Sequence, residues 1–259
     1  MRQREAVEAI TESLKKDDLV KAVFLKGSMG RGEDDEHSDV DLYVLVDEAD
    51  KEAFLKNRQM HLESYQRIIF YDDIFIIAPQ IIAVYENLLH VDLFTVTDDT
   101  LIHKDFFHVV YDPEKRMEKH EAHQNLYLDK KDFLYAVDDI AFFFLQYKKA
   151  ADRGNDLWAV KVANDIGLNV AKVLLQRYAP DRAQLGLKAV PHALSSSRVQ
   201  EMENVYRWIS LDHHEKAVVQ MAALMEKHLE WLEDCWGNET YTIPFLKRMI
   251  EEMKNRTPS

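Results

Sequence analysis

The stretch VFLKGSMGRGEDDEHSDVDLYVLV, residues 23–46, decides how this chain is organised. Its apolar start is typical of a buried strand, and the glycine-rich segment 27–32 that follows predicts a turn. A charged loop then leads through Asp39 and Asp41 into a second predicted strand, residues 40–46. Because side chains alternate along a strand, we expect Asp39 and Asp41 to share one face while Val40 and Leu42 point into the core.

Two carboxylates on one face, next to a glycine-rich turn, indicate a phosphate-handling site. Asp39 and Asp41 offer the oxygen ligands that a hard divalent cation prefers. The turn at Gly27 and Ser28 offers backbone N–H groups and a hydroxyl to phosphate oxygens. Either half alone is common, as a solvated strand edge or an ordinary turn. Their combination in one strand–turn–strand unit is a much more specific pattern.

A third carboxylate lies in the later stretch LHVDLF, residues 89–94. Alternation puts His90 and Asp92 on one face of this predicted strand and Val91 and Leu93 on the other. An aspartate between large apolar residues is poorly placed for ordinary solvation, which favours a position in a cleft. Two-metal phosphoryl chemistry uses such a carboxylate as a metal ligand or a general base. We interpret His90 as a packed or exposed strand residue.

Composition limits the function classes. The chain has 259 residues, 47% of them hydrophobic and 31% charged, which is ordinary for a globular protein. The net charge of −13 argues against a nucleic-acid-binding protein and is compatible with a cationic substrate, although many proteins are acidic for solubility alone. With the single cysteine, Cys235, no internal disulfide can form. The N-terminus is no secretion signal and no apolar run is long enough for a bilayer, so we expect a cytoplasmic protein without membrane contact.

Hydrophobic periodicity divides the chain into two parts. The first is expected to contain helices over residues 2–16 and 50–65 and strands over residues 21–26, 40–46, 67–70, 74–78, 81–85, 89–96 and 107–111. The second shows only helical spacing, over residues 132–151, 156–178, 198–209, 212–236 and 244–254. We therefore predict an α/β (α+β) domain with a mixed sheet over residues 1–115, followed by an all-α helical bundle over residues 116–259.

These motifs resemble a known family. The strand, G-S-x-x-R-G and S-D-x-D-L pattern is similar to the signature of the polymerase-β-like nucleotidyltransferase superfamily. The run IIAVYENLLHVDLFTV, residues 81–96, looks like the third-carboxylate hairpin of aminoglycoside adenylyltransferases, especially the streptomycin 6-adenylyltransferase-like group. Lincosamide nucleotidyltransferases share the layout of catalytic domain plus bundle. The resemblance covers roughly residues 20–112. The sequence departs from the family's pattern in lacking a glycine at the 86–88 turn.

The resemblance implies a Mg²⁺-dependent transfer of a nucleoside monophosphate, from ATP or another nucleoside triphosphate, to a hydroxyl of a small acceptor, for which a cationic, aminoglycoside-like antibiotic is one example. Asp39, Asp41 and Asp92 would be catalytic and bind the metal, in a two-metal site, with Asp92 as a third ligand or general base. Gly27, Ser28 and Arg31 would bind the nucleotide phosphates. The acceptor would lie between the domains, with antibiotic resistance as one consequence, in a monomer or homodimer.

Other functions remain open at this stage. The transfer could instead modify a protein side chain or RNA ends, although the acidic charge disfavours RNA. The chain could also be a non-catalytic, antitoxin-like nucleotide-binding regulator, which the presence of all three candidate carboxylates disfavours. A calcium-binding structural module would need a loop of spaced oxygen ligands of the EF-hand kind, and the sequence contains none.

Overall fold

The structure is a computed structural model that describes residues 1–101, 105–236 and 241–256. The chain divides into two compact units, Met1–Asn125 and Leu126–Ser259. The sequence placed its boundary after residue 115, and the roles that it gave to the two domains stay predictions. No helix among the described residues combines the length and apolar character needed to span a bilayer.

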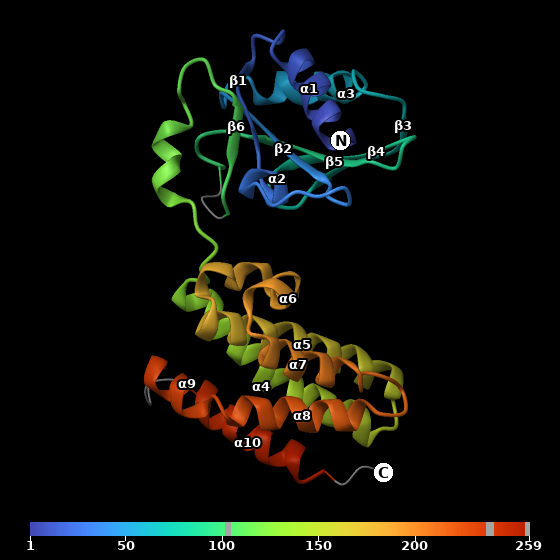
Figure 1. The fold of residues 1–259 in the computed structure, drawn as a ribbon, viewed down its shortest axis with the longest axis vertical. Helices are drawn as coiled ribbons and strands as arrows, with labels where there is room; N and C mark the ends of the chain where they lie inside the picture. Colours follow the sequence, from blue (N-terminus) through green and yellow to red (C-terminus); the bar gives the residue numbers. More distant parts are fainter. Residues whose placement is uncertain (102–104, 237–240, 257–259) are drawn as a thin grey trace. The chain divides into compact units, whose positions relative to one another are not determined.

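The first unit is built on a six-stranded mixed sheet (Figure 1), which confirms the predicted fold class. Its strands lie in the order β3-β4-β5-β2-β1-β6. β2 pairs with β5 in parallel, and every other neighbouring pair is antiparallel. The strands are β1 Val20–Leu25, β2 Val40–Val46, β3 Ile68–Phe75, β4 Pro79–Tyr85, β5 His90–Val96 and β6 His108–Tyr111.

Two helices cover one face of this sheet, α1 (Arg2–Leu14) and α3 (Lys51–Leu62), as Figure 1 shows. Ile10 of α1 and Phe54 of α3 are fully buried in one cluster with Val44 and Leu93 of the central strands. The opposite face carries an aromatic row, in which the ring of Tyr43 lies 5.2 Å from that of Phe24 and 4.4 Å from that of Phe94. Both faces of β2 and β5 are thus buried for most of their length, as expected of central parallel strands.

One strand prediction is wrong. The sequence separated strands at residues 67–70 and 74–78, because Asp72 and Asp73 interrupt the apolar pattern, but the structure has a single strand, β3. β3 is an edge strand whose residues are mostly exposed, so aspartates are tolerated there, and its backbone pairs with β4 along its length. Asp73 also forms an ion pair with Arg58 of α3.

The second unit is helical throughout its described residues, as predicted. Its elements are α4 Lys130–Asp152, α5 Asp156–Tyr178, the 3-10 helix η2 Pro180–Lys188, α6 Val190–Ala193, α7 Ser196–Tyr206, α8 His214–Glu226, α9 Leu229–Trp236 and α10 Thr242–Lys254. A further 3-10 helix, η1 (Glu118–His123), lies near the end of the first unit. The predicted helix 212–236 is divided into α8 and α9.

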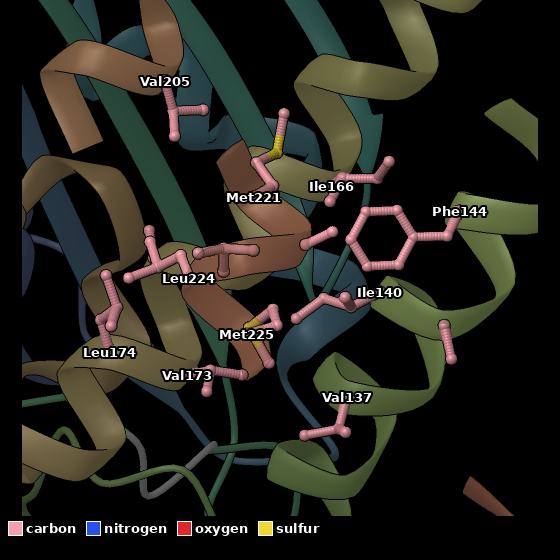
Figure 2. Close-up of a cluster of buried hydrophobic side chains, with 14 of the residues drawn as sticks. Val137, Ile140, Phe144, Ile166, Val173, Leu174, Val205, Met221, Leu224 and Met225 are labelled. Atoms are coloured by element: carbon pink, nitrogen blue, oxygen red, sulfur yellow. The ribbon is translucent and has the colours of Figure 1, made fainter. Parts of the chain in front are cut away.

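The bundle has its own hydrophobic core (Figure 2). Ile140 and Phe144 of α4, Ile166 of α5, and Met221 and Met225 of α8 point into one cluster, and all five are fully buried. The helices that contribute them are amphipathic, with apolar residues at a helical period. Each unit therefore buries a core of its own and is expected to fold as a domain.

Candidate active site

The parallel pairing of β2 with β5 brings two of the predicted carboxylates together. In this register Asp41 lies directly opposite Asp92. Asp39 comes just before β2, and half of its side chain is exposed, whereas the residue Asp92 is only 9% exposed. All three aspartates therefore lie at the start of the two central strands, on adjacent segments of chain.

The glycine-rich segment passes directly against Asp41. It forms a short helix, α2 (Gly27–Arg31), rather than a plain turn. Gly27 has a φ of +60°, and a Cβ built on it would lie 1.9 Å from Asp41 Oδ2. At Gly30 a Cβ would lie 2.7 Å from the carbonyl oxygen of Leu25. A larger residue at Gly30 would require a shift of the backbone, and one at Gly27 would displace the Asp41 carboxylate and strain a backbone with positive φ.

The structure places Ser28 and Arg31 in α2, the helix that begins at Gly27. Ser28 follows Gly27 and is half-buried. The guanidinium of Arg31 donates from Nη1 to Asp105 and from Nε to Glu33, both at 2.8 Å. Arg31 is thus already paired with two carboxylates, and its contact with phosphate stays a prediction, as does that of Ser28.

Two neighbours that the sequence did not single out as functional hold Asp92 in place. Gln80 on β4 donates its amide to Asp92 Oδ1 at 2.9 Å, and His90 Nε2 lies 3.0 Å from the same oxygen. His90 Nδ1 also lies 3.9 Å from Asp39 Oδ2, so its imidazole stands between two of the carboxylates. Gln80 is a single polar residue in an otherwise apolar strand, which is the signal that could have found it.

Burial and the crowding of negative charge together set the electrostatics here. Burial, together with the charges of Asp39 and Asp92, raises the pKa of Asp41 to about 6. The hydrogen bond with Asp92 raises the pKa of His90. Burial lowers the pKa of Lys26, while the charges of Asp105 and Asp41 oppose that shift. Lys26 is a further residue that the sequence analysis did not single out, because it lies at the end of a predicted strand.

The donor set suits a divalent cation, although the side chains are not arranged as a complete ligand shell. Among the described residues, no group of three or more His, Cys, Asp or Glu side chains is positioned to hold a metal ion. The raised pKa of Asp41 nevertheless reflects its burial together with repulsion from Asp39 and Asp92. Mg²⁺ commonly takes one or two carboxylates together with substrate phosphates, so an incomplete protein shell fits this ion.

Comparison with known families agrees with this geometry. Residues 8–84 match the family model described as Polymerase beta, Nucleotidyltransferase. The first unit carries a polymerase beta nucleotidyltransferase domain. The match confirms the resemblance seen in the sequence, and it makes the chain a nucleotidyltransferase enzyme. It includes Asp39 and Asp41 and ends before β5, so that Asp92 lies outside the matched residues.

Several solved structures are similar to this nucleotidyltransferase over most of its length. An aminoglycoside 6-adenyltransferase from Bacillus subtilis is 14% identical, with 99% of each chain covered and a TM-score of 0.43. A nucleotidyltransferase-like protein from Exiguobacterium sibiricum is 10% identical, with 96% of this chain and 88% of that chain covered and a TM-score of 0.44.

A STING-associated CdnE c-di-GMP synthase from Capnocytophaga granulosa is 15% identical, with 98% of this chain and 78% of that chain covered and a TM-score of 0.32. These values are too low for any of the three to indicate the substrate of this chain. No curated protein matches it.

The pKa of Asp41 leads to a prediction about stability. Because its pKa rises to about 6 on folding, the folded state binds more protons than the unfolded state from about pH 4 to about pH 6. This group therefore favours the folded state at low pH, and its contribution is lost as pH rises through that window. Asp41→Asn removes the effect, so the stability of the variant relative to wild type should rise by about 1–2 kcal/mol over the window.

The measurement is urea unfolding of both proteins from about pH 4 to about pH 7, with EDTA present to remove divalent cations. The exposed Glu36→Gln provides a control that should follow wild type at every pH. A difference in unfolding free energy between Asp41→Asn and wild type that stays constant across the series would contradict the raised pKa of Asp41.

Proposed function

We propose that the chain transfers a nucleoside monophosphate from ATP, or another nucleoside triphosphate, to a hydroxyl of a small acceptor. The main support is the pairing of Asp41 with Asp92 across β2 and β5, with Gly27 against the Asp41 carboxylate. In such a reaction the bond from the acceptor oxygen to the α-phosphorus forms as the bond to the pyrophosphate oxygen breaks. Pyrophosphate carries the bonding electrons away.

Asp39, Asp41 and Asp92 are the residues that would hold Mg²⁺. When bound, the ion neutralises charge that develops on the phosphates. Asp92 then either completes the metal shell or takes the proton of the attacking hydroxyl. Gln80 and His90 orient its carboxylate, since both contact Oδ1 and leave Oδ2 for another partner. Rigid positioning of this kind favours in-line attack.

The phosphates of the nucleotide would lie against α2. The backbone at Gly27 approaches the Asp41 carboxylate without an intervening side chain, so a phosphate oxygen and a cation held by Asp41 could both come close. The Ser28 hydroxyl, one residue later, can donate to a phosphate that does not react. Arg31 adds positive charge nearby, partly offset by its pairs with Asp105 and Glu33.

The second unit is the proposed acceptor-binding domain, and charge favours a cationic acceptor. The chain has a net charge of −13. On α4, burial raises the pKa of Asp139, and the charges of Asp138 and Asp165 contribute. Asp138 accepts a hydrogen bond from Thr242, which gives it a packing role between α4 and α10. Asp139 is therefore the better residue for testing attraction of a polycation.

The first prediction from this proposal concerns turnover. Asp41→Asn removes an anionic ligand at the point where charge develops, so pyrophosphate release should fall about 100- to 1,000-fold. The assay combines each of four nucleoside triphosphates and Mg²⁺ with aminoglycosides and lincosamides. Asp72→Asn, an exposed aspartate on β3, is the matched control and should keep wild-type turnover. Normal turnover by a well-folded Asp41→Asn protein would exclude this residue from the reaction.

The second prediction concerns the acceptor. Aminoglycoside-like polycations should bind the nucleotide-loaded protein, with affinity that falls as salt rises, because the Debye length is only about 10 Å at 0.1 M. Calorimetry should show weaker binding for Asp139→Asn and unchanged binding for Asp212→Asn, an exposed aspartate of the same unit. Normal Mg²⁺–nucleotide binding without heat from any polycation would instead favour a protein acceptor or a regulatory role.

A further inference from the structure

A second cavity lies in the first unit, away from the three carboxylates. Its volume is about 620 Å³, within the range of small-molecule sites. It opens between α3 and the β3–β4 hairpin and reaches Thr100, which follows β5. The aspartates lie where β2 and β5 begin, whereas Thr100 follows the other end of β5, so the cavity is distinct from the three carboxylates.

The wall of this cavity contains a buried arginine with unsatisfied donors. Arg58 of α3 is 3% exposed, and its Nη2 donates to Asp73 of β3. Its Nε and Nη1 are buried and have no hydrogen-bond partner among the described residues. A buried guanidinium without acceptors is costly, because water no longer satisfies its N–H groups. An anionic group bound at this wall of the cavity would supply the missing acceptor.

The charge of the lining favours an anion. The lining contains three cations, Lys51, Lys56 and Arg58, and two carboxylates, Glu52 and Asp73, an excess of one positive charge. Within the described part of the chain, the exposed Lys56 has no ion pair, whereas Lys51 pairs with Glu48. This excess stands out in a protein with a net charge of −13. The planar fork of arginine matches the oxygens of a carboxylate or a phosphate.

Apart from Thr100, the rest of the lining is apolar, and its largest hairpin residues are exposed. Leu55 of α3 lies on one side, with Phe75, Ile77 and Pro79 of the hairpin on the other. Phe75 is 73% exposed and Ile77 48% exposed, which is unusual for large apolar residues grouped together. An apolar ligand body would cover these side chains while its anionic group reached the cations.

We propose that this cavity binds a small molecule with a phosphate or carboxylate at Arg58 and Lys56 and an apolar body against Phe75 and Ile77. This site is separate from the nucleotide site and does not depend on the function proposed above. Its hairpin wall ends at Pro79, next to Gln80, which holds Asp92. A ligand in this cavity would therefore lie one residue away from Gln80, which positions Asp92 of the candidate active site.

The test uses three probes of one shape on the full chain: 1-naphthyl phosphate, 1-naphthoate and the uncharged 1-naphthalenemethanol. Fluorescence titration should show 1:1 binding of an anionic probe at least about tenfold tighter than the neutral one. The tighter anion identifies phosphate or carboxylate as the group recognised. A non-hydrolysable ATP analogue at saturation should leave this binding in place, because the nucleotide site is elsewhere.

Two exposed positions give variants that should fold. Lys56→Glu and Phe75→Ser should each weaken the anionic probe about tenfold or more. The matched controls lie in the second unit: the exposed Lys188→Glu for charge and the half-exposed Phe142→Ser for the aromatic ring. Both controls should bind the probe as wild type does, and circular dichroism should confirm that all four variants are folded.

Several results would overturn the proposal. These are equal binding of charged and uncharged probes, unchanged binding by both Lys56→Glu and Phe75→Ser, or displacement of the probe by the ATP analogue. Each of these readouts is binding at a site that the transfer reaction does not use. Failure here would therefore leave the proposed nucleotidyl transfer unaffected, and loss of turnover would leave this proposal unaffected.

Discussion

The parallel pairing of β2 with β5 is the constraint on which the candidate active site depends. Its register fixes Asp41 opposite Asp92 at the start of both strands. The two segments are separated by α3, β3 and β4 in the sequence, so only this pairing brings their carboxylates together. A slip of one residue would turn Asp92 to the other face and leave Asp41 without its neighbour. The burial of Val40 and Val91 within the core opposes such a slip.

The same pairing concentrates negative charge, and the surroundings only partly offset it. Gln80 and His90 both contact one oxygen of Asp92. The positive charge of Lys26 interacts with the carboxylate of Asp41. The pKa of Asp41 still rises to about 6. A group poised in this way gains most from a bound cation, because the cation removes the repulsion that burial strengthens. The proposed metal requirement and the predicted pH dependence of stability both follow from this one arrangement.

Local motifs made much of this structure predictable. The glycine-rich segment and Asp39–Asp41 are adjacent in the sequence, and the close approach at Gly27 accounts for a residue type that the motif requires. Asp92 could be found because an aspartate stands out in an apolar strand. Gln80 and Lys26 could not be placed, since their partners depend on strand order and register. Hydrophobic periodicity failed to predict the edge strand β3 as one element, because both of its faces are largely solvated.

Iron-directed cleavage tests the central claim most directly, since Fe²⁺ can replace Mg²⁺ and generates hydroxyl radicals that cut the backbone nearby. With a non-hydrolysable ATP analogue, ascorbate and peroxide, the account predicts cuts close to Asp39, Asp41 and Asp92, at the starts of β2 and β5. Excess Mg²⁺ should protect both places together. Cuts elsewhere, or none beside a bound nucleotide, would contradict the assignment of these carboxylates to the metal.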